Sequence, residues 1–169
     1  CIVNGKEIYT NNTVTQVIPH NHGHILANVH LAGRSEMESA CTSAVQAQSE
    51  WIDMGLEGRA SIFERCADLL AGDWRMKVNA ATMLNQSKTV YQAEIDAACE
   101  LIDFWRFNAY YTRQFHNQFQ PLVSPEGIAN TTEIRPLEGF VLAITPFNFS
   151  SIAGNLPSAP ALVGCTALW

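Results

Sequence analysis

Residues 140–155 read FVLAITPFNFSSIAGN, and this stretch decides the fold that we predict for the chain. Residues 140–144 form a continuous apolar run of strand length, which is typical of a strand covered on both faces in a parallel sheet. Thr145-Pro146 ends the run, because proline has no N–H for the sheet ladder and holds the residue before it extended. Asn148 therefore follows just beyond the carboxyl end of the predicted strand, between two phenylalanines.

The position of Asn148 allows two interpretations. Ligands of open α/β sheets bind outside the carboxyl ends of the strands. An amide held there is suited to donate a hydrogen bond to a developing negative charge. Alternatively, Asn148 only caps the helix that follows, since asparagine is a favoured residue at helix N-termini. The spacing of the residues leaves both interpretations open.

Seven segments of the chain together resemble the aldehyde dehydrogenase superfamily. Within it they are similar to the delta-1-pyrroline-5-carboxylate dehydrogenase family, whose members are also called L-glutamate γ-semialdehyde dehydrogenases. Phe147 supports this narrower resemblance, because most of the superfamily has tryptophan at that position. The resemblance covers nearly the whole chain. The segments are Ile144–Phe149, Ala153–Leu156, Pro160–Leu162, Glu138–Phe140, Glu100–Phe104, Gln92–Asp96 and Asn21–His24.

The resemblance implies the NAD-dependent oxidation of L-glutamate γ-semialdehyde to L-glutamate in the breakdown of proline. In that chemistry a thiolate attacks the aldehyde, hydride leaves to the nicotinamide, and water hydrolyses the thioester. Asn148 matches the family's oxyanion-stabilising asparagine. Ile144 and Thr145 match positions on the nicotinamide side of the cofactor, and Phe149 matches an aromatic wall around the aldehyde.

Glu100 is the remaining candidate site residue. It lies in the longest predicted helix, residues 90–119, whose apolar residues occupy several faces and indicate a largely buried helix. A charge in such a helix needs a partner or a functional reason. One interpretation is that Glu100 and Asp103 pair with Arg106 or face water. In the family, a glutamate of this helix lies near the substrate's amino group, so the resemblance implies that Glu100 binds this ammonium.

The sequence carries no complete catalytic apparatus. None of its five cysteines stands in the family's nucleophile context, and no glycine-rich phosphate loop is present. The final residues, 165–169, read as an unfinished strand, which favours a fragment. Two hypotheses follow: the chain is a segment of a complete NAD-dependent dehydrogenase, or it is a non-catalytic interaction module. In either case we expect the 169 residues alone to be inactive.

The other elements follow from periodicity and turn signals. Residues 2–31 read as short strands or hairpins, with a turn at His22-Gly23. Ser35 and Glu38 form a capping-box pattern before the first helix. Pro157 and Pro160 predict a short or bent helix, capped by Ser150 or Ser151. The remaining predictions are helices at 35–52, 59–71 and 74–86, a strand at 131–135, a helix to about residue 163 and a strand at 165–169.

The predicted fold class is α/β, the N-terminal part of an aldehyde dehydrogenase fold. It combines a helical layer, an antiparallel excursion and the start of a Rossmann-like parallel sheet. Residues 1–119 would form the N-terminal strands and the helical layer of the cofactor-binding domain. By resemblance, residues 120–138 form an oligomerisation-type β excursion, although an ordinary surface hairpin is an alternative. Residues 139–169 would form the first βαβ unit of the dinucleotide-binding domain.

The composition and the charge pattern argue against several classes of binding partner. The net charge of −6 comes without a cluster of lysine or arginine, which argues against nucleic acid. No apolar run reaches the roughly 18 residues of a membrane span. His20, His22 and His24 alternate, but no nearby cysteine or carboxylate completes a metal shell, so we predict no metal site. Scattered cysteines favour a reducing compartment. The resemblance implies a homo-oligomer located in the mitochondrial matrix of a eukaryote, or otherwise in the cytoplasm.

Overall fold

The computed structural model describes residues 1–119 and 123–169. Its N-terminal part consists of two antiparallel hairpins. Strand β1 (Ile2–Val3) pairs with β2 (Lys6–Glu7), and β3 (Thr13–Ile18) pairs with β4 (Asn21–His30). The predicted turn at His22-Gly23 is wrong, because the chain reverses at Pro19-His20. Pro19 has no N–H to donate to a sheet ladder and so ends β3.

Helices make up most of the rest of the chain. The predicted helices at 35–52, 59–71 and 74–86 are confirmed, although the second begins four residues earlier, at Gly55. Gly55 has φ +73, a conformation that suits glycine and turns the chain from one helix directly into the next. The helices are α1 (Arg34–Asp53), α2 (Gly55–Ala71), α3 (Arg75–Gln86), α4 (Val90–Ala93), the π-helix η1 (Glu94–Cys99), α5 (Glu100–Gln118) and α6 (Ser150–Leu162).

The predicted capping box of α1 is wrong. The helix begins one residue before Ser35, and Gly33 is its N-cap. Glu36 therefore occupies the third helical position, and its carboxylate accepts a hydrogen bond from the Gly33 N–H at 2.6 Å. Glu38 instead pairs with Arg34 at 2.7 Å. The Ser35 hydroxyl and the Gly33 N–H hold the pKa of Glu36 below its usual value.

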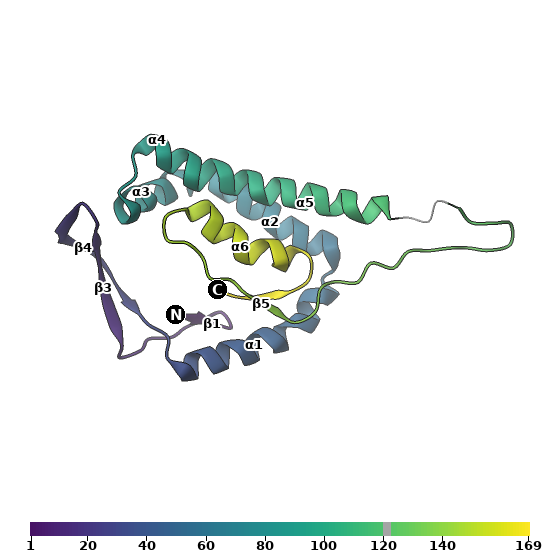
Figure 1. Ribbon diagram of the computed structural model, residues 1–169, viewed down its shortest axis with the longest axis horizontal. Coiled ribbons are helices and arrows are strands. Elements are labelled where there is room, and N and C mark those ends of the chain that lie inside the picture. Colours follow the sequence, from purple (N-terminus) through teal and green to yellow (C-terminus); the bar gives the residue numbers. More distant parts are fainter. Residues whose placement is uncertain (120–122) are drawn as a thin grey trace.

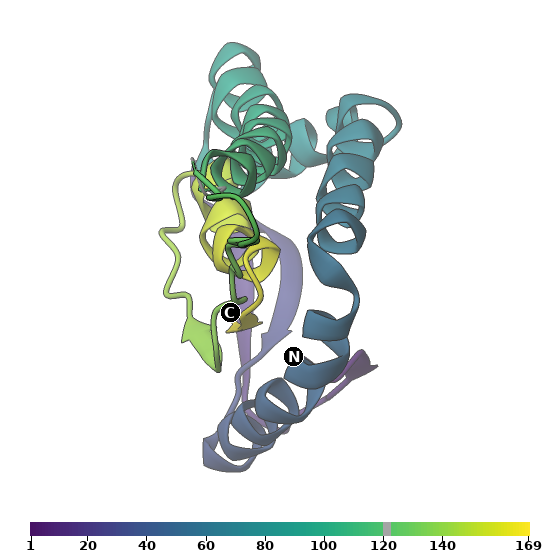
Figure 2. The same ribbon diagram turned by 90° about the vertical axis from the view of Figure 1, so that its right-hand side faces the viewer.

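The predicted βαβ unit is confirmed. Strand β5 (Phe140–Leu142) pairs in parallel with β6 (Thr166–Leu168), and α6 connects them. Helix α6 packs on one face of this pair and α1 on the other, while α2 and α5 cover the outer side of α6 (Figures 1 and 2). This mixed layering confirms the α/β fold class.

Strand β5 is shorter and more open than predicted. It ends at Leu142 rather than Ile144, and these two side chains are 55% and 81% exposed. Ala143, between them, is buried. Burial on both faces requires neighbours on both sides, and in the described part of the chain β5 has one neighbouring strand.

The excursion that follows α5 contains no regular strand in residues 123–138, so the predicted strand at 131–135 is wrong. A strand needs a partner for its backbone donors and acceptors. The contacts recorded here are instead local, with Ile128 N–H bonded to the Pro125 carbonyl at 3.0 Å and Asn130 Nδ2 to the Val123 carbonyl at 2.9 Å. The segment extends away from the helices (Figure 1). Residues 120–122 of the predicted excursion lie outside the described residues.

Arg59, a buried residue of α2, joins the ends of two other helices. Its Nε donates to the Leu162 carbonyl at 3.0 Å, and its Nη1 donates to the carbonyls of Trp51 and Ile52, both at 3.2 Å. These acceptors lie in the last turns of α6 and α1, where helix carbonyls lack intrahelical partners and the helix dipole is negative. Burial lowers the pKa of Arg59. The guanidinium therefore satisfies acceptors that the fold has removed from water.

Helix α6 approaches α5 closely at Gly154. A Cβ on this residue would lie 2.7 Å from Leu101 Cδ2, and Leu101 is part of the buried cluster between α2 and α5. Two further contacts join the helices, from Trp105 Nε1 to Ser158 Oγ and from Asn108 Nδ2 to Asn155 Oδ1, both at 2.9 Å. Close packing against Leu101 therefore favours glycine at this position.

Replacing Arg59 with methionine is expected to lower the free energy of unfolding by about 3 kcal/mol, because one buried and two partly buried carbonyls lose a donor. Urea denaturation followed by circular dichroism measures this loss. Arg65→Met, at an exposed position of the same helix, is the matched control and should change stability by less than about 0.5 kcal/mol. Equal denaturation midpoints for the two variants would contradict this role for Arg59.

Gly154→Ala is expected to lower the free energy of unfolding by about 1–3 kcal/mol, because the added methyl group overpacks the interface with Leu101. Gly23→Ala is the control, since its Cβ would have its nearest neighbour at an ordinary 3.6 Å. Thermal unfolding of the two variants measures whether Gly154→Ala is less stable than Gly23→Ala. A Gly154→Ala protein as stable as the parent would show that α6 and α5 do not depend on this close approach.

Candidate functional site

The carboxyl ends of β5 and β6 open onto a hollow of about 440 Å³. Ile144 and Thr145 line it together with Leu168 and Trp169. Thr145 Oγ1 accepts a hydrogen bond from Trp169 Nε1 at 3.2 Å. Apart from Thr145 the lining side chains are apolar, so the hollow suits an uncharged ring better than a phosphate group.

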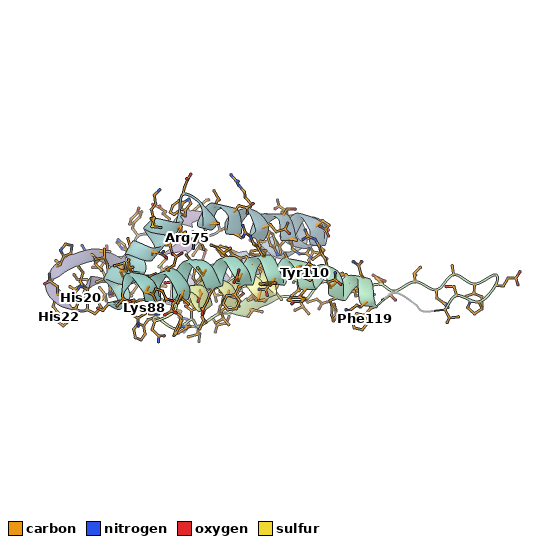
Figure 3. All side chains as sticks on the ribbon, turned by 90° about the horizontal axis from the view of Figure 1, so that it is seen from above. His20, His22, Arg75, Lys88, Tyr110 and Phe119 are labelled. Atoms are coloured by element: carbon orange, nitrogen blue, oxygen red, sulfur yellow. The ribbon has the colours of Figure 1, made fainter. Side chains whose placement is uncertain are left out.

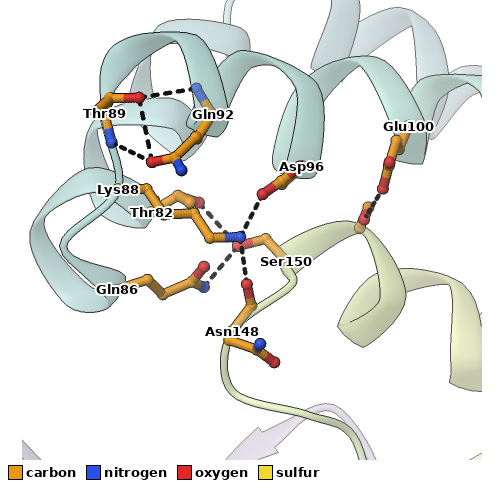
Figure 4. Close-up of polar contacts among 10 residues, drawn as sticks. Thr82, Gln86, Lys88, Thr89, Gln92, Asp96, Glu100, Asn148 and Ser150 are labelled. Atoms are coloured by element: carbon orange, nitrogen blue, oxygen red, sulfur yellow. Dashed lines mark hydrogen bonds and ion pairs between the residues drawn. The ribbon is translucent and has the colours of Figure 1, made fainter.

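Asn148 lies in the loop between β5 and α6, and its side chain is exposed. The interpretation of Asn148 as the helix cap is wrong, because Phe149 is the N-cap of α6 and makes no side-chain cap bond. Figure 4 shows the Asn148 carboxamide on the side of the residue away from Lys88, with its main-chain carbonyl directed toward the Lys88 ammonium. The carboxamide makes no hydrogen bond to any described residue, so its N–H groups are available to a ligand.

The two serines after the loop were also predicted as caps, and this prediction is wrong as well. Ser150 and Ser151 are the first helical residues of α6. The Ser150 hydroxyl is bonded to Thr82 Oγ1 at 2.8 Å and accepts from Gln86 Nε2 at 3.0 Å. These contacts attach the start of α6 to α3 rather than to its own backbone.

Lys88 joins the Asn148 loop to the helical layer. Its ammonium donates to Asp96 Oδ2 at 2.6 Å and to the Asn148 carbonyl, and it lies 4.0 Å from the centre of the Phe149 ring. The side chains of Lys88 and Asp96 are only 13% and 19% exposed. Phe149, predicted as a wall of the site, is thus half-buried with one ring face against this cation.

Glu100 contacts the first turn of α6. Its Oε2 accepts a hydrogen bond from Ser151 Oγ at 2.7 Å, and Figure 4 shows Glu100 directed toward the start of α6. Ser151 is fully buried. The interpretation that Glu100 pairs with Arg106 is wrong, because Arg106 pairs with Asp68 at 2.9 Å. Ser151 is three residues after Asn148, so Glu100 and Asn148 both lie at the N-terminal end of α6.

The long helix predicted for residues 90–119 contains an unexpected π-helical segment, η1. Such segments occur frequently at functional sites and change the direction in which the side chains point. Asp96 lies within η1 and Glu100 directly follows it, four residues later, so both face the same side. Asp96 therefore meets Lys88, and Glu100 meets Ser151.

Lys88, Asp96 and Ser151 were not identified by sequence reasoning. Lys88 contacts the Asn148 carbonyl, 60 residues away in the sequence, and no local sequence pattern predicts such a contact. A usable signal lies beside it, since Thr89 and Gln92 form a capping box that fixes where α4 begins.

Three of the five cysteines lie in environments that do not favour a nucleophile. Burial raises the pKa of the thiols of Cys66, Cys99 and Cys165, whereas a reactive thiolate needs a lowered pKa. Cys1 is exposed, and its Sγ donates to the His30 carbonyl at 3.3 Å. Cys41 belongs to α1.

The described part of the chain offers neither a metal-ligand cluster nor a membrane-spanning helix. Residues 1–119 and 123–169 hold no group of three or more histidine, cysteine or acidic side chains that would fit a metal ion. His20 Nδ1 is instead bonded to Ser87 Oγ at 2.8 Å. None of the helices in these residues combines the length and the apolar content that crossing a bilayer requires.

Comparison with known proteins gives consistent matches along the chain. The profile of the aldehyde dehydrogenase family matches residues 8–169. A delta-1-pyrroline-5-carboxylate dehydrogenase of Agaricus bisporus is 49% identical over 169 residues, which are 100% of this chain and 31% of the relative. The mitochondrial delta-1-pyrroline-5-carboxylate dehydrogenase of Homo sapiens is 48% identical over 100% of this chain and 30% of its own length.

A solved structure is also similar. The delta-pyrroline-5-carboxylate dehydrogenase of Mycobacterium tuberculosis bound with NAD superposes with a TM-score of 0.95 and 51% identity, over 99% of this chain and 31% of that chain. The chain thus spans a little under a third of the length of the relatives it matches.

Proposed function

The chain belongs to the aldehyde dehydrogenase family, and we propose that it contributes to an enzyme that oxidises L-glutamate γ-semialdehyde to L-glutamate with NAD. The semialdehyde is the open form of delta-1-pyrroline-5-carboxylate, so the reaction belongs to proline breakdown. The proposal concerns a protein of the relatives' full length, because this chain spans 31% and 30% of two of them. The observation that carries it is the Asn148 loop at the open carboxyl edge of β5.

Asn148 is proposed to stabilise the oxyanion of the tetrahedral intermediate. Its carboxamide is exposed and unengaged by the described residues, while its main chain is held by Lys88. A donor fixed before the reaction needs no reorganisation when the negative charge develops, and this preorganisation is the basis of oxyanion stabilisation.

Ile144 and Thr145 are proposed to contact the nicotinamide side of NAD, which accepts the hydride when it is bound. The side chains that line the hollow are mostly apolar, and the Thr145 hydroxyl and the Trp169 indole N–H are polar, which fits an uncharged ring with a polar substituent. The location agrees with the general rule that ligands of α/β sheets bind beyond the carboxyl ends of the strands.

Glu100 is proposed to bind the substrate's ammonium group. Asp96, on the same side of the helix, is neutralised by Lys88, whereas Glu100 is bonded to the neutral hydroxyl of Ser151. Glu100 thus has no cationic partner among the described residues. A carboxylate in this state at the edge of a site favours a cationic group of the ligand. Phe149 is proposed to border the aldehyde.

The attacking thiolate is proposed to come from a part of the full-length protein outside these 169 residues. The raised pKa values of three of the cysteines support this assignment. The isolated chain is therefore proposed to be inactive. A non-catalytic module that associates with full-length subunits is the alternative function, and turnover by a full-length product of the gene would exclude it.

The division of the chain is proposed as residues 1–119, 120–138 and 139–169, with the middle part contributing to a homo-oligomer. Support comes from exposed aromatic side chains at the C-terminal end of α5, which continue toward the excursion and include Phe115 and the C-cap residue Phe119, with ring centroids 4.6 Å apart. Figure 3 places Tyr110 and Phe119 along this direction, away from Lys88. In a eukaryote the enzyme is proposed to act in the mitochondrial matrix, and otherwise in the cytoplasm.

Asn148→Ala in the full-length enzyme is expected to lower kcat by about 10²–10³, because one oxyanion donor is lost. The dissociation constant of NAD should stay unchanged, since the side chain acts on the reacting carbonyl. Steady-state kinetics and fluorescence titration of NAD measure these two quantities. Asn117→Ala, at an exposed position of α5, is the control. Normal turnover by Asn148→Ala would remove the proposed role.

Glu100→Gln is expected to weaken use of the glutamate semialdehyde by about tenfold or more in kcat/KM, because a charged hydrogen-bond acceptor for the ammonium is lost. Use of propanal, which has no ammonium, should change little. Glutamine keeps an oxygen that can accept from Ser151, so the start of α6 is retained. Asp103→Asn, at an exposed position of the same helix, serves as control. An unchanged preference between the two aldehydes would refute this assignment.

A further inference from the structure

We propose that Lys88 is a positioning residue for Asn148: its ammonium holds the main-chain carbonyl of Asn148 so that the carboxamide faces the substrate. The catalytic part of this inference rests on the proposed function, whereas the structural part does not. Lys88 is the last of the three lysines in the sequence, and its side chain is largely buried. A mostly covered lysine side chain whose ammonium reaches a carbonyl of the candidate site needs an explanation.

The N–H groups of the Lys88 ammonium have identifiable partners. A lysine ammonium has three N–H groups and no acceptor. One N–H is directed to Asp96 and one to the Asn148 carbonyl, while the face of the Phe149 ring lies 4.0 Å from the nitrogen. Two consecutive residues of the loop, 148 and 149, are thus held by one side chain (Figure 4).

The backbone that carries Lys88 is itself fixed. Ser87 ends α3 in a left-handed conformation with φ 54, and Thr89 is the N-cap of α4. Thr89 N–H donates to Gln92 Oε1 at 3.0 Å, and Gln92 N–H donates to Thr89 Oγ1 at 3.2 Å. Lys88 therefore projects from a short turn whose two ends are both defined by helix termini. Because this turn is fixed at both ends, the position of the Lys88 side chain that contacts the Asn148 loop is restricted.

Stability alone does not account for this arrangement. Removing two charges from water costs free energy that a buried ion pair only partly recovers, so apolar replacements of both partners are often neutral or stabilising. Lys88 and Asp96 are 13% and 19% exposed, and Asp96 is directed toward Lys88 from the π-helical segment. The pair instead fixes the orientation of a third group, the Asn148 carbonyl, which an apolar pair would leave without a donor.

The orientation of the carbonyl determines where the carboxamide lies. The two groups belong to the same residue, and Figure 4 shows them on different sides of it. The carboxamide has no described partner of its own, so the peptide held by Lys88 supplies its orientation. Displacing a catalytic group by about 1 Å costs as much as 10²-fold in rate.

Lys88→Met in the full-length enzyme is therefore expected to lower kcat by about 10- to 100-fold, with an unchanged dissociation constant for NAD. In the Asn148→Ala background the same substitution should change kcat by less than about twofold, because the group that it positions is already absent. Lys77→Met, at an exposed lysine on α3, is the matched control for loss of a lysine. If the loss of kcat in the double variant equals the product of the losses in Lys88→Met and Asn148→Ala, the proposal is overturned.

Two further measurements separate positioning from folding. The pair replacement Lys88→Met/Asp96→Leu leaves no uncompensated charge, so it should keep the melting temperature while losing kcat as Lys88→Met does. Hydrogen exchange of the peptide covering residues 145–152 should become faster in both variants, while exchange in α2 stays constant. Unchanged exchange in this peptide would overturn the proposal whatever the activity shows.

These measurements also distinguish failure of the inference from failure of the proposed function. If the wild-type enzyme does not oxidise the semialdehyde, or Asn148→Ala is fully active, the proposed function fails. Hydrogen exchange then decides alone whether Lys88 holds the loop. If Asn148→Ala is slow and Lys88→Met is as fast as the wild type, only the inference fails.

Discussion

The buried guanidinium of Arg59 is the contact on which the arrangement of the layers depends. It binds the last turns of α1 and α6 at once, and these two helices lie on opposite faces of the β5–β6 pair. Trp51 Nε1 strengthens the junction by donating to the Ala161 carbonyl at 2.8 Å. Because α6 contains Pro157 and Pro160, it lacks two backbone donors and cannot rely on its own ladder. Its position must come from contacts at its ends and along its sides.

Helix α6 is accordingly held at both ends by charged groups from other parts of the chain. Arg59 binds its C-terminal carbonyls, while Lys88 and Glu100 contact the loop and the first turn at its N-terminus. Gly154 lets its side approach Leu101 on α5. The Asn148 loop directly precedes this restrained helix. Its C-terminal end is therefore fixed by α6, and its Asn148 carbonyl is held by Lys88.

The local features of the fold were predictable from the sequence, and the contacts between distant elements were not. The apolar run before Thr145-Pro146 located β5, although the strand ends at Leu142, and helical periodicity located α1 to α3. Burial of β5 on both faces and the strand at 131–135 failed because each depends on neighbours that a single segment does not encode. Arg59 and Lys88 act across 103 and 60 residues, and their charges look like ordinary surface charges when the sequence is read. The π-helical segment likewise has no signature in the apolar pattern.

On one side of the candidate site the polar side chains have hydrogen-bond or ion-pair partners, and on the other side the groups are exposed. We call these the satisfied side and the open side. On the satisfied side, Lys88 neutralises Asp96 and Ser151 donates to Glu100, while Ser150 is bonded to Thr82 and Gln86. On the open side lie Ile144 and the Asn148 carboxamide. Polar side chains that fix a loop from behind and leave its donor exposed in front are what electrostatic preorganisation requires, because the donor is positioned before the charge appears. A loop whose only role was to begin a helix would direct its asparagine back to the helix N–H groups, and here Phe149 occupies that cap position instead. The division of the loop into a restrained main chain and an unengaged carboxamide therefore favours recognition of a ligand over helix capping.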